Sequence, residues 1–115
     1  MSNIQNRNGM QVVIELIEVD KAAQVKDLCF QLKEETEDLF CVLLANVAGK
    51  PNISIIIGDQ LVQEKNYHAG NLVREWSKEI KGGGGGQPFF AQAGGADVAG
   101  LEKVKERAVN FINEG

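Results

Sequence analysis

The chain has too few cysteines and histidines for several common kinds of protein. Cys29 and Cys41 are the only cysteines among 115 residues, too few and too far apart for a disulfide framework or a zinc knuckle. Each lies among apolar residues, which favours reduced, buried thiols over reactive ones. His68 is the only histidine, and one histidine cannot build a multi-histidine metal centre. We therefore expect no metal and no other cofactor in this domain.

Long apolar runs are also missing. No run approaches the roughly 20 residues that a membrane-spanning helix requires. The start of the chain lacks the basic and then apolar segments of a secretory signal peptide. A cytoplasmic location with no membrane partner is the default expectation. The hydrophobic share of 43% suits one globular domain with a modest core.

An excess of positive charge is absent as well. The net charge of −4 argues against indiscriminate binding of nucleic acid. The charge is unevenly spread, because residues 1–40 hold eight acids and four bases, whereas residues 41–81 hold five bases and four acids. Lys65, Arg74, Lys78 and Lys81 cluster late in that second stretch. A local basic face is therefore compatible with the negative total.

The hydrophobic pattern predicts one α/β, or α+β, domain: a mixed β-sheet packed by helices in the order β-α-β-β-α-β-α. Residues 1–9 are polar and are expected to be a disordered segment or linker. Asp20 is the expected N-cap of the first helix, and residues 49–52 the turn of a hairpin. The expected strands span 10–17, 40–47, 53–58 and 88–93, and the expected helices 21–35, 68–80 and 98–113.

Five consecutive glycines, Gly82 to Gly86, are the most informative feature. Glycine lacks a Cβ, so this run exposes bare N–H and C=O groups and permits close approach of another molecule. Three readings remain open: a flexible linker, tight packing against the next strand, or a surface for a ligand. No Gly-Lys-Ser/Thr follows, so a nucleoside-triphosphate loop is unsupported.

The glycines belong to a longer ordered motif. His68-Ala69-Gly70 opens a helix, the glycine run follows with Gln87-Pro88, and Ala91-Gln92-Ala93-Gly94-Gly95 comes next. This combination resembles the extreme C-terminal domain of bacterial alanyl-tRNA synthetases, and the resemblance covers about residues 10–113. The same domain type occurs behind DHH-family phosphoesterases, where it holds nucleic acid for a separate catalytic domain.

The resemblance implies a C-terminal tRNA-binding module over residues 10–113 that is not itself an enzyme. In the family, such a module contacts the tRNA elbow and supports aminoacylation and editing by upstream domains. Those domains use ATP and zinc, and none of their machinery is expected here. The implied partners are the alanine tRNA, tRNA(Ala), and the upstream domains of the same synthetase. The isolated domain is expected to be a monomer, with weak homodimerisation as an alternative.

The chain departs from the family pattern at several positions. Gln87 replaces a common Arg and Asn71 a common Lys, which removes two expected phosphate contacts. Phe89 and Phe90 replace Asp-Met and could supply stacking or core. A His tends to follow the glycines in the phosphoesterase versions. Here Gln87-Pro88 follows the glycines, which favours a synthetase domain over the substrate clamp of a phosphoesterase.

No catalytic residue is expected, and the RNA-binding candidates are basic, glycine or amide residues around the motif: Lys65, His68, Arg74, Lys78, Lys81, Gly82, Gly83, Gly84, Gly85, Gly86 and Gln92. Cations there could neutralise phosphates, although Glu75 and Glu79 between them fit an ordinary solvated helix face equally well. His68, at a helix start, fits a capping role, and Gln92 fits either a base edge or a structural hydrogen bond.

The aromatic residues divide by their spacing. Trp76 lies at helical spacing with Leu72 and Val73 and is expected in the core, and Tyr67 is expected to be half-buried. Phe89 and Phe90 are expected on opposite faces of one strand, so at most one of them could stack on a base.

Overall fold

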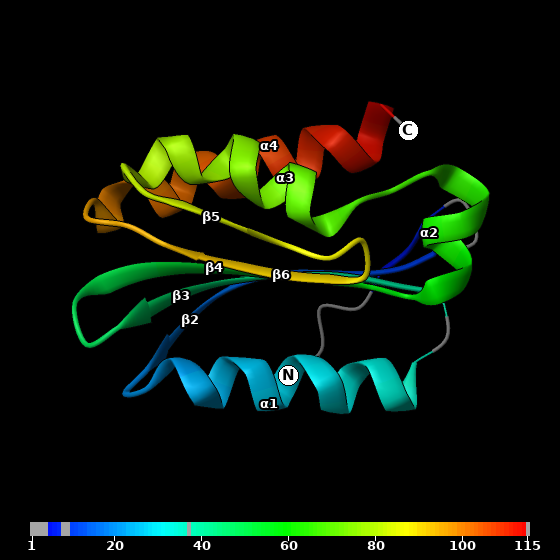
Figure 1. The fold of residues 1–115 in the computed structure, drawn as a ribbon, viewed down its shortest axis with the longest axis horizontal. Coiled ribbons are helices and arrows are strands. Elements are labelled where there is room, and N and C mark those ends of the chain that lie inside the picture. The colour runs from blue at the N-terminus through cyan, green and yellow to red at the C-terminus, as the bar shows by residue number, and fades with distance from the viewer. Residues whose placement is uncertain (1–4, 8–9, 37, 115) are drawn as a thin grey trace.

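The structure is a computed structural model, and it describes residues 5–7, 10–36 and 38–114. A six-stranded sheet has helix α1 on one face and helices α3 and α4 on the other (Figure 1). The elements in chain order are β1 (Gln5–Arg7), β2 (Met10–Val19), α1 (Ala22–Glu35), β3 (Leu39–Val47), β4 (Lys50–Ile57), α2 (Asp59–Lys65), α3 (Ala69–Trp76), η1 (Ser77–Ile80), β5 (Gly83–Gly86), β6 (Phe90–Gly94), η2 (Val98–Gly100) and α4 (Leu101–Glu114).

The strand order across the sheet is β1-β2-β3-β4-β6-β5. Strands β2 and β3 are parallel because α1 carries the chain back across one face, and the other neighbours are antiparallel. This confirms the predicted mixed sheet and the predicted order of its elements. Three elements are additional: β1, in the segment for which we expected no regular structure, together with α2 and β5.

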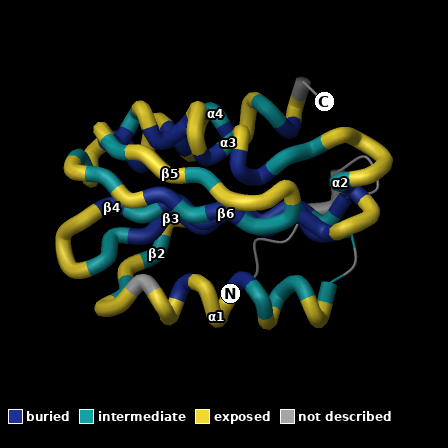
Figure 2. Tube along the Cα trace, viewed as in Figure 1, coloured by how far each residue is buried: buried dark blue, intermediate teal, exposed yellow. Residues whose placement is uncertain are grey.

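Strand β3 is the centre of the molecule. Its first seven residues are buried, as its continuous apolar sequence predicts for a strand covered on both faces (Figure 2). Phe40, Val42 and Leu44 join the core under α3 and α4, while Cys41 and Leu43 join the core under α1. The sheet therefore separates two hydrophobic cores, and the larger one positions α3.

The hairpin turn lies earlier than expected, at Ala48 and Gly49, whose φ angles are +51° and +90°. Two consecutive positive φ values match the turn type that favours two-residue hairpins. The amide of Gly49 donates to Asn46 Oδ1 at 2.7 Å. Strand β4 consequently begins at Lys50, and the expected turn over residues 49–52 is wrong by about two residues.

Two helix predictions also need correction. Lys21, not Asp20, is the N-cap of α1, and Gln24 Oε1 accepts from the backbone amides of both residues at 3.1 Å. Helix α2 was missed because it is one short stretch with Leu61 as its only buried residue, too little to make an apolar stripe. Among the described residues, no helix is long and apolar enough to cross a membrane.

The expected helix over residues 68–80 exists, but it tightens near its end. α3 continues without a break into the 3₁₀ turn η1, and Lys81 ends it with a φ of +55°. Val73, Trp76 and Ile80 are buried against the sheet, as their spacing predicts. Helix α3 is thereby fixed directly beside the glycine run.

Candidate nucleic-acid interface

The glycine run forms a strand. Gly83–Gly86 pair with β6 in antiparallel register, from Gly83 opposite Gly94 to Gly86 opposite Ala91. We expected a loop, and the strand shows that neighbouring β6 orders these bare peptide units. As an edge strand, β5 stays accessible: Gly83, Gly84 and Gly86 are exposed, and Gly85 is half-buried (Figure 2).

Alternate glycines of the run are required by packing. A Cβ on Gly82 would lie 2.0 Å from the Gly94 oxygen, and one on Gly84 would lie 2.5 Å from the Gln92 oxygen. A Cβ on Gly86 would lie 2.6 Å from the Phe90 oxygen. No real Cβ atom sits so close to a backbone oxygen, so the tight-packing reading is correct for these three positions.

Gly83 and Gly85 differ from those three. A Cβ on Gly83 would meet no atom within 4 Å, and one on Gly85 would meet only Arg74 Nη2, at 3.8 Å. Neither residue has the left-handed φ that favours glycine. Within the described part of the chain, therefore, no packing or backbone constraint accounts for glycine at these two positions.

The His68-Ala69-Gly70 motif joins the start of α3 to the turn that follows β5 by hydrogen bonds. The amides of Ala69 and Gly70 donate to the oxygens of Pro88 and Gln87 at 2.9 and 3.2 Å. A Cβ on Gly70 would lie 2.5 Å from the Gly86 oxygen, so the contact needs glycine at position 70. The first turn of α3 thus satisfies its amides with carbonyls of the β5–β6 turn.

His68 has the capping role that its position allows. Its Nδ1 accepts from the amide of Asn71 at 3.1 Å, which satisfies another amide at the start of α3. Its Cε1 lies 3.0 Å from the position that a Cβ on Gly70 would take. The structure thus shows His68 as the cap of α3, and its contact with RNA stays a prediction.

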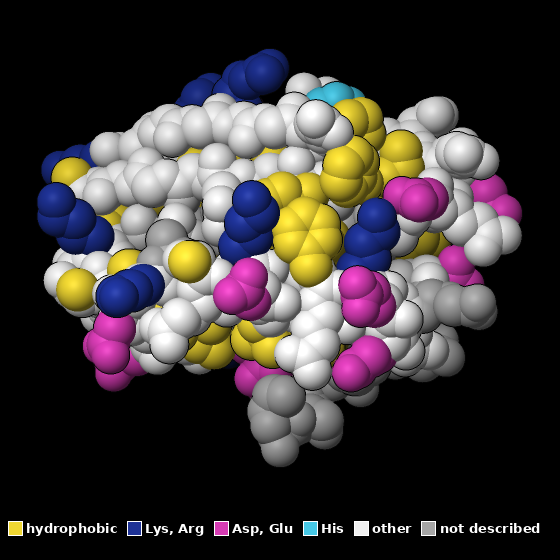
Figure 3. All heavy atoms as spheres, turned by 60° about the horizontal axis from the view of Figure 1, so that its bottom comes forward, with side chains coloured by type: hydrophobic (Ala, Val, Ile, Leu, Met, Phe, Trp, Pro, Cys, Tyr) yellow, Lys and Arg dark blue, Asp and Glu magenta, His cyan; other side chains and the backbone are white. Residues whose placement is uncertain are grey.

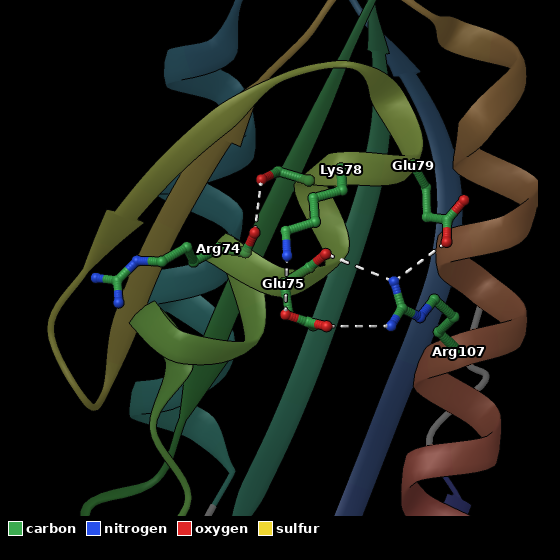
Figure 4. A network of polar contacts seen from close by, with 6 residues as sticks. Arg74, Glu75, Lys78, Glu79 and Arg107 are labelled. Atoms are coloured by element: carbon green, nitrogen blue, oxygen red, sulfur yellow. Dashed lines mark hydrogen bonds and ion pairs between the residues drawn. The ribbon is translucent and has the colours of Figure 1, made fainter.

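The charged residues of α3 and η1 form a network with Arg107 of α4 (Figure 4). Arg107 contacts Glu79 at 3.1 Å and Glu75 at 3.6 Å, and Glu75 also pairs with Lys78 at 3.5 Å. The acids that interrupt the basic face are thus engaged by cations, and Lys78 is held by one of them. Arg74 points away from this network and makes no ion pair with any described residue.

The other basic candidates do not gather at one point. Lys81 is exposed and stands directly before the glycines, two residues ahead of β5. Lys65 is the exposed last residue of α2, which lies at the end of the sheet where β5 turns into β6 (Figure 1). Among these cations, Arg74 has its Nη2 3.8 Å from the position of a Cβ on Gly85, Lys81 is near β5 through its place in the chain, and Lys65 lies on a separate helix.

Gln92 participates in a polar line across the sheet. Its Nε2 donates to Ser54 Oγ at 3.0 Å, and Ser54 Oγ donates to Asn52 Oδ1 at 3.0 Å. The structural hydrogen bond expected as one alternative is therefore present. Gln92 is half-buried and also lines a hollow beside the glycines.

That hollow brings in residues of α1 that sequence reasoning did not select. It lies between α1 and the β5–β6 turn, and its lining includes Lys26, Phe30, Gly85 and Phe89. Lys33, one turn further along α1, places its Nζ 4.7 Å from the centre of the Phe89 ring. Lys26, Phe30 and Lys33 recur at helical spacing, a signal that the sequence offered.

The two phenylalanines after the glycines do not lie on opposite faces of a strand, contrary to our expectation. Phe89 precedes β6 and Phe90 is its first residue, so both line the same hollow. Phe90 packs with Phe30 at 4.9 Å between ring centres. Phe89 belongs to neither hydrophobic core.

The remaining candidates have structural roles. Trp76 is 4% exposed and in the core, as predicted. Tyr67 is half-buried against Phe40 and Phe111, and desolvation raises its pKa. The described residues contain no group of three or more potential metal ligands.

Comparisons with known proteins place this geometry in a family. The model of the DHHA1 domain matches residues 9–114. Alanine–tRNA ligases of Christiangramia forsetii and Cytophaga hutchinsonii are each 45% identical to the chain, over 95% and 91% of its length. The chain spans only 12% of either relative.

The fold has a known counterpart as well. The crystal structure of the C-Ala domain from Aquifex aeolicus alanyl-tRNA synthetase superposes with a TM-score of 0.74. The match covers 91% of this chain and 96% of that one, at 22% identity. The resemblance to the C-terminal synthetase domain is therefore confirmed, and the chain belongs to the DHHA1 domain family.

Proposed function

We propose that this domain is a non-catalytic tRNA-binding module of an alanine–tRNA ligase. In this role it holds the elbow of tRNA(Ala) while other domains of the ligase carry out aminoacylation and editing. The ligases to which the chain is similar support the proposal, and the chain's share of their length fits one module of such an enzyme.

The open faces of Gly83 and Gly85 are the observation that carries the proposal. Packing accounts for the other three glycines of the run, and an approaching molecule would account for these two. An RNA backbone is such a molecule, because bare amides of an exposed edge strand can donate to phosphate oxygens at close range.

Electrostatics support contact at the same place. The Arg74 guanidinium lies beside Gly85 and is not engaged by a described carboxylate, so it can form a two-pronged contact with a phosphate. Lys81 stands two residues before the same strand. With a net charge of −4 and few cations in reach, recognition must rely on the folded shape of the RNA more than on charge.

The experiment is to compare binding of two RNAs to this chain at low salt. Full-length tRNA(Ala) transcript contains the elbow, whereas a minihelix of its acceptor and T stems lacks the folded corner. The proposal expects the full transcript to bind at least tenfold more tightly in a fluorescence-anisotropy titration. Equal affinities, or no binding of the transcript, would contradict it.

A further inference from the structure

A hollow of about 320 Å³ lies where α1 ends its coverage of the sheet. Helix α1 packs over β2, β3 and β4, and it contacts β6 through Phe30, whose ring centre lies 4.9 Å from that of Phe90. The residues that border the hollow include Lys26, Phe30, Gly85, Gly86, Phe89 and Gln92. The hollow is therefore continuous with the glycine strand but extends onto a different helix from the one that supplies Arg74.

Phe89 differs from the other two phenylalanines of the hollow. Phe30 and Phe90 pack against the core under α1, whereas Phe89 belongs to neither core. Only its backbone has a clear structural task, because the Phe89 oxygen accepts from the amide of Ile57 at 2.8 Å. The ring is half-buried and has Lys33 Nζ 4.7 Å from its centre, so a partner that stacks on Phe89 must use the part of the ring that Lys33 leaves open.

Cations flank the rings. Lys26 is exposed at one border, and Lys33 lies over the Phe89 ring while pairing with Asp59 at 3.3 Å. Figure 3 shows hydrophobic side chains gathered between Lys or Arg side chains on the face that carries α1, although acidic side chains also lie near them. The combination is an aromatic wall, bare backbone and local positive charge.

Those three features together match the platforms that bind unpaired nucleotides. In such platforms a base stacks on an aromatic ring while nearby cations neutralise its phosphate. The bare backbone at Gly85 and Gly86 adds space for the base to approach edge-on. An apolar peptide would fit less well, because two lysines border the rings.

We propose that the hollow holds one unpaired nucleobase of the bound RNA, stacked on Phe89, with the adjoining phosphate at Lys26. The proposal rests on the tRNA-binding function proposed above and adds to it a second contact site, on α1. Arg74 and the glycine strand would hold the backbone, and the hollow would take a base that is not paired in the folded RNA.

The test is a titration of tRNA(Ala) transcript into the wild-type chain and into two variants, Phe89→Ala and Lys26→Ala. Loss of a stacked base should weaken binding about 5- to 100-fold in Phe89→Ala. Lys26→Ala should weaken binding several-fold, while the matched control Lys105→Ala, an exposed lysine on α4, should not. Circular dichroism checks that each variant is folded.

A second readout locates the base directly. In NMR spectra of the wild-type chain, the ring resonances of Phe89 and the amides of Gly85 and Gly86 should shift on addition of the transcript. Wild-type binding with unchanged affinity in Phe89→Ala and no ring shifts would overturn the hollow as a base site, yet leave the tRNA-binding function intact. Absence of binding by the wild-type chain would overturn both. If Phe89→Ala fails to fold, Lys26→Ala and the ring shifts decide in the same way.

Discussion

The five glycines of residues 82–86 are not equivalent. A Cβ on Gly82, Gly84 or Gly86 would point into the backbone of the following segment. A Cβ on Gly83 or Gly85 would point away from it. This alternation is that of a strand, in which successive residues face opposite sides. The run therefore contains three positions at which packing requires glycine and two at which a Cβ could be accommodated.

Stability should distinguish the two sets. We expect Gly84→Ala to lower the free energy of unfolding by about 1–3 kcal/mol, because its Cβ would be forced against the Gln92 oxygen. Gly83→Ala should change stability by less than about 0.5 kcal/mol, since its Cβ meets open space. Urea unfolding of both variants measures the difference, and equal stabilities would show that the strand is packed differently.

The two cysteines should be inert in the folded chain. Both are fully buried, and the hydrogen bond between Cys41 and Cys29, together with desolvation, raises the pKa of the Cys41 thiol above its ordinary value of 9.0. The stability gained from the neutral Cys41 thiol is complete below pH 9.0 and is lost as the pH rises toward the folded pKa, because only the unfolded chain ionises readily there. Neither thiol should react with iodoacetamide at pH 8 until urea unfolds the chain. Rapid alkylation under native conditions, detected by mass spectrometry, would contradict the burial.

At the scale of elements, the hydrogen bonds between the start of α3 and the β5–β6 turn explain why the His68-Ala69-Gly70 motif and the glycine run occur together. The amides that begin α3 need acceptors, and the Gln87 and Pro88 carbonyls supply them. The absence of a Cβ at Gly70 permits the close approach of α3 to the Gly86 oxygen. The helix start and the glycine strand thus form one unit.

Removing the cap should loosen that unit. His68→Ala should lower the free energy of unfolding by about 1 kcal/mol, because the Asn71 amide loses its acceptor. His68→Asn should restore most of the loss, since asparagine is a favoured cap. Thermal unfolding of the three chains measures this, and a His68→Ala variant as stable as wild type would show that the cap contributes nothing.

The regular elements with strong periodicity were predictable. The central strand β3 and the apolar stripe of α3 follow from burial patterns that a sequence displays directly. The glycine strand β5 was not predictable, because residues without side chains have no periodicity and pair only through their backbone with β6. Helix α2 was too short for its single buried residue to indicate a face.

The site was predictable only in part. The residues on α3 and the glycine run were found because they are adjacent in sequence. The contribution of α1 was missed, because Lys26 and Phe30 reach the hollow through the parallel crossover between β2 and β3. The sequence also could not show that Glu79 pairs with Arg107 while Arg74 has no ion pair with a described residue, because Arg107 lies almost 30 residues beyond Glu79 in the chain.

At the scale of the whole molecule, the surfaces that we propose for RNA lie along one edge of the sheet, at β5. The glycine strand is bordered by Arg74 of α3 on one side and by the hollow against α1 on the other. An RNA in this position would contact both layers of helices that enclose the sheet. Binding would therefore depend on the assembled fold and not on one segment alone.

The salt dependence of the affinity should show how many phosphates this surface contacts. We expect the affinity for tRNA(Ala) to fall with rising salt, with a logarithmic slope reduced by about 1 in Arg74→Ala. Lys105→Ala on α4 should leave the slope unchanged. Identical slopes for wild type and Arg74→Ala would show that the guanidinium beside Gly85 does not contact a phosphate.

Gly83→Val provides the most direct measurement. Its side chain would project from the accessible face of β5 into space that no atom of the described chain occupies, so the fold should be retained. If that face docks tRNA, the affinity for tRNA(Ala) transcript should fall at least tenfold in Gly83→Val and stay unchanged in Asn110→Val, a control on the exposed face of α4. A folded Gly83→Val chain that binds the transcript as tightly as wild type would contradict docking at the glycine strand.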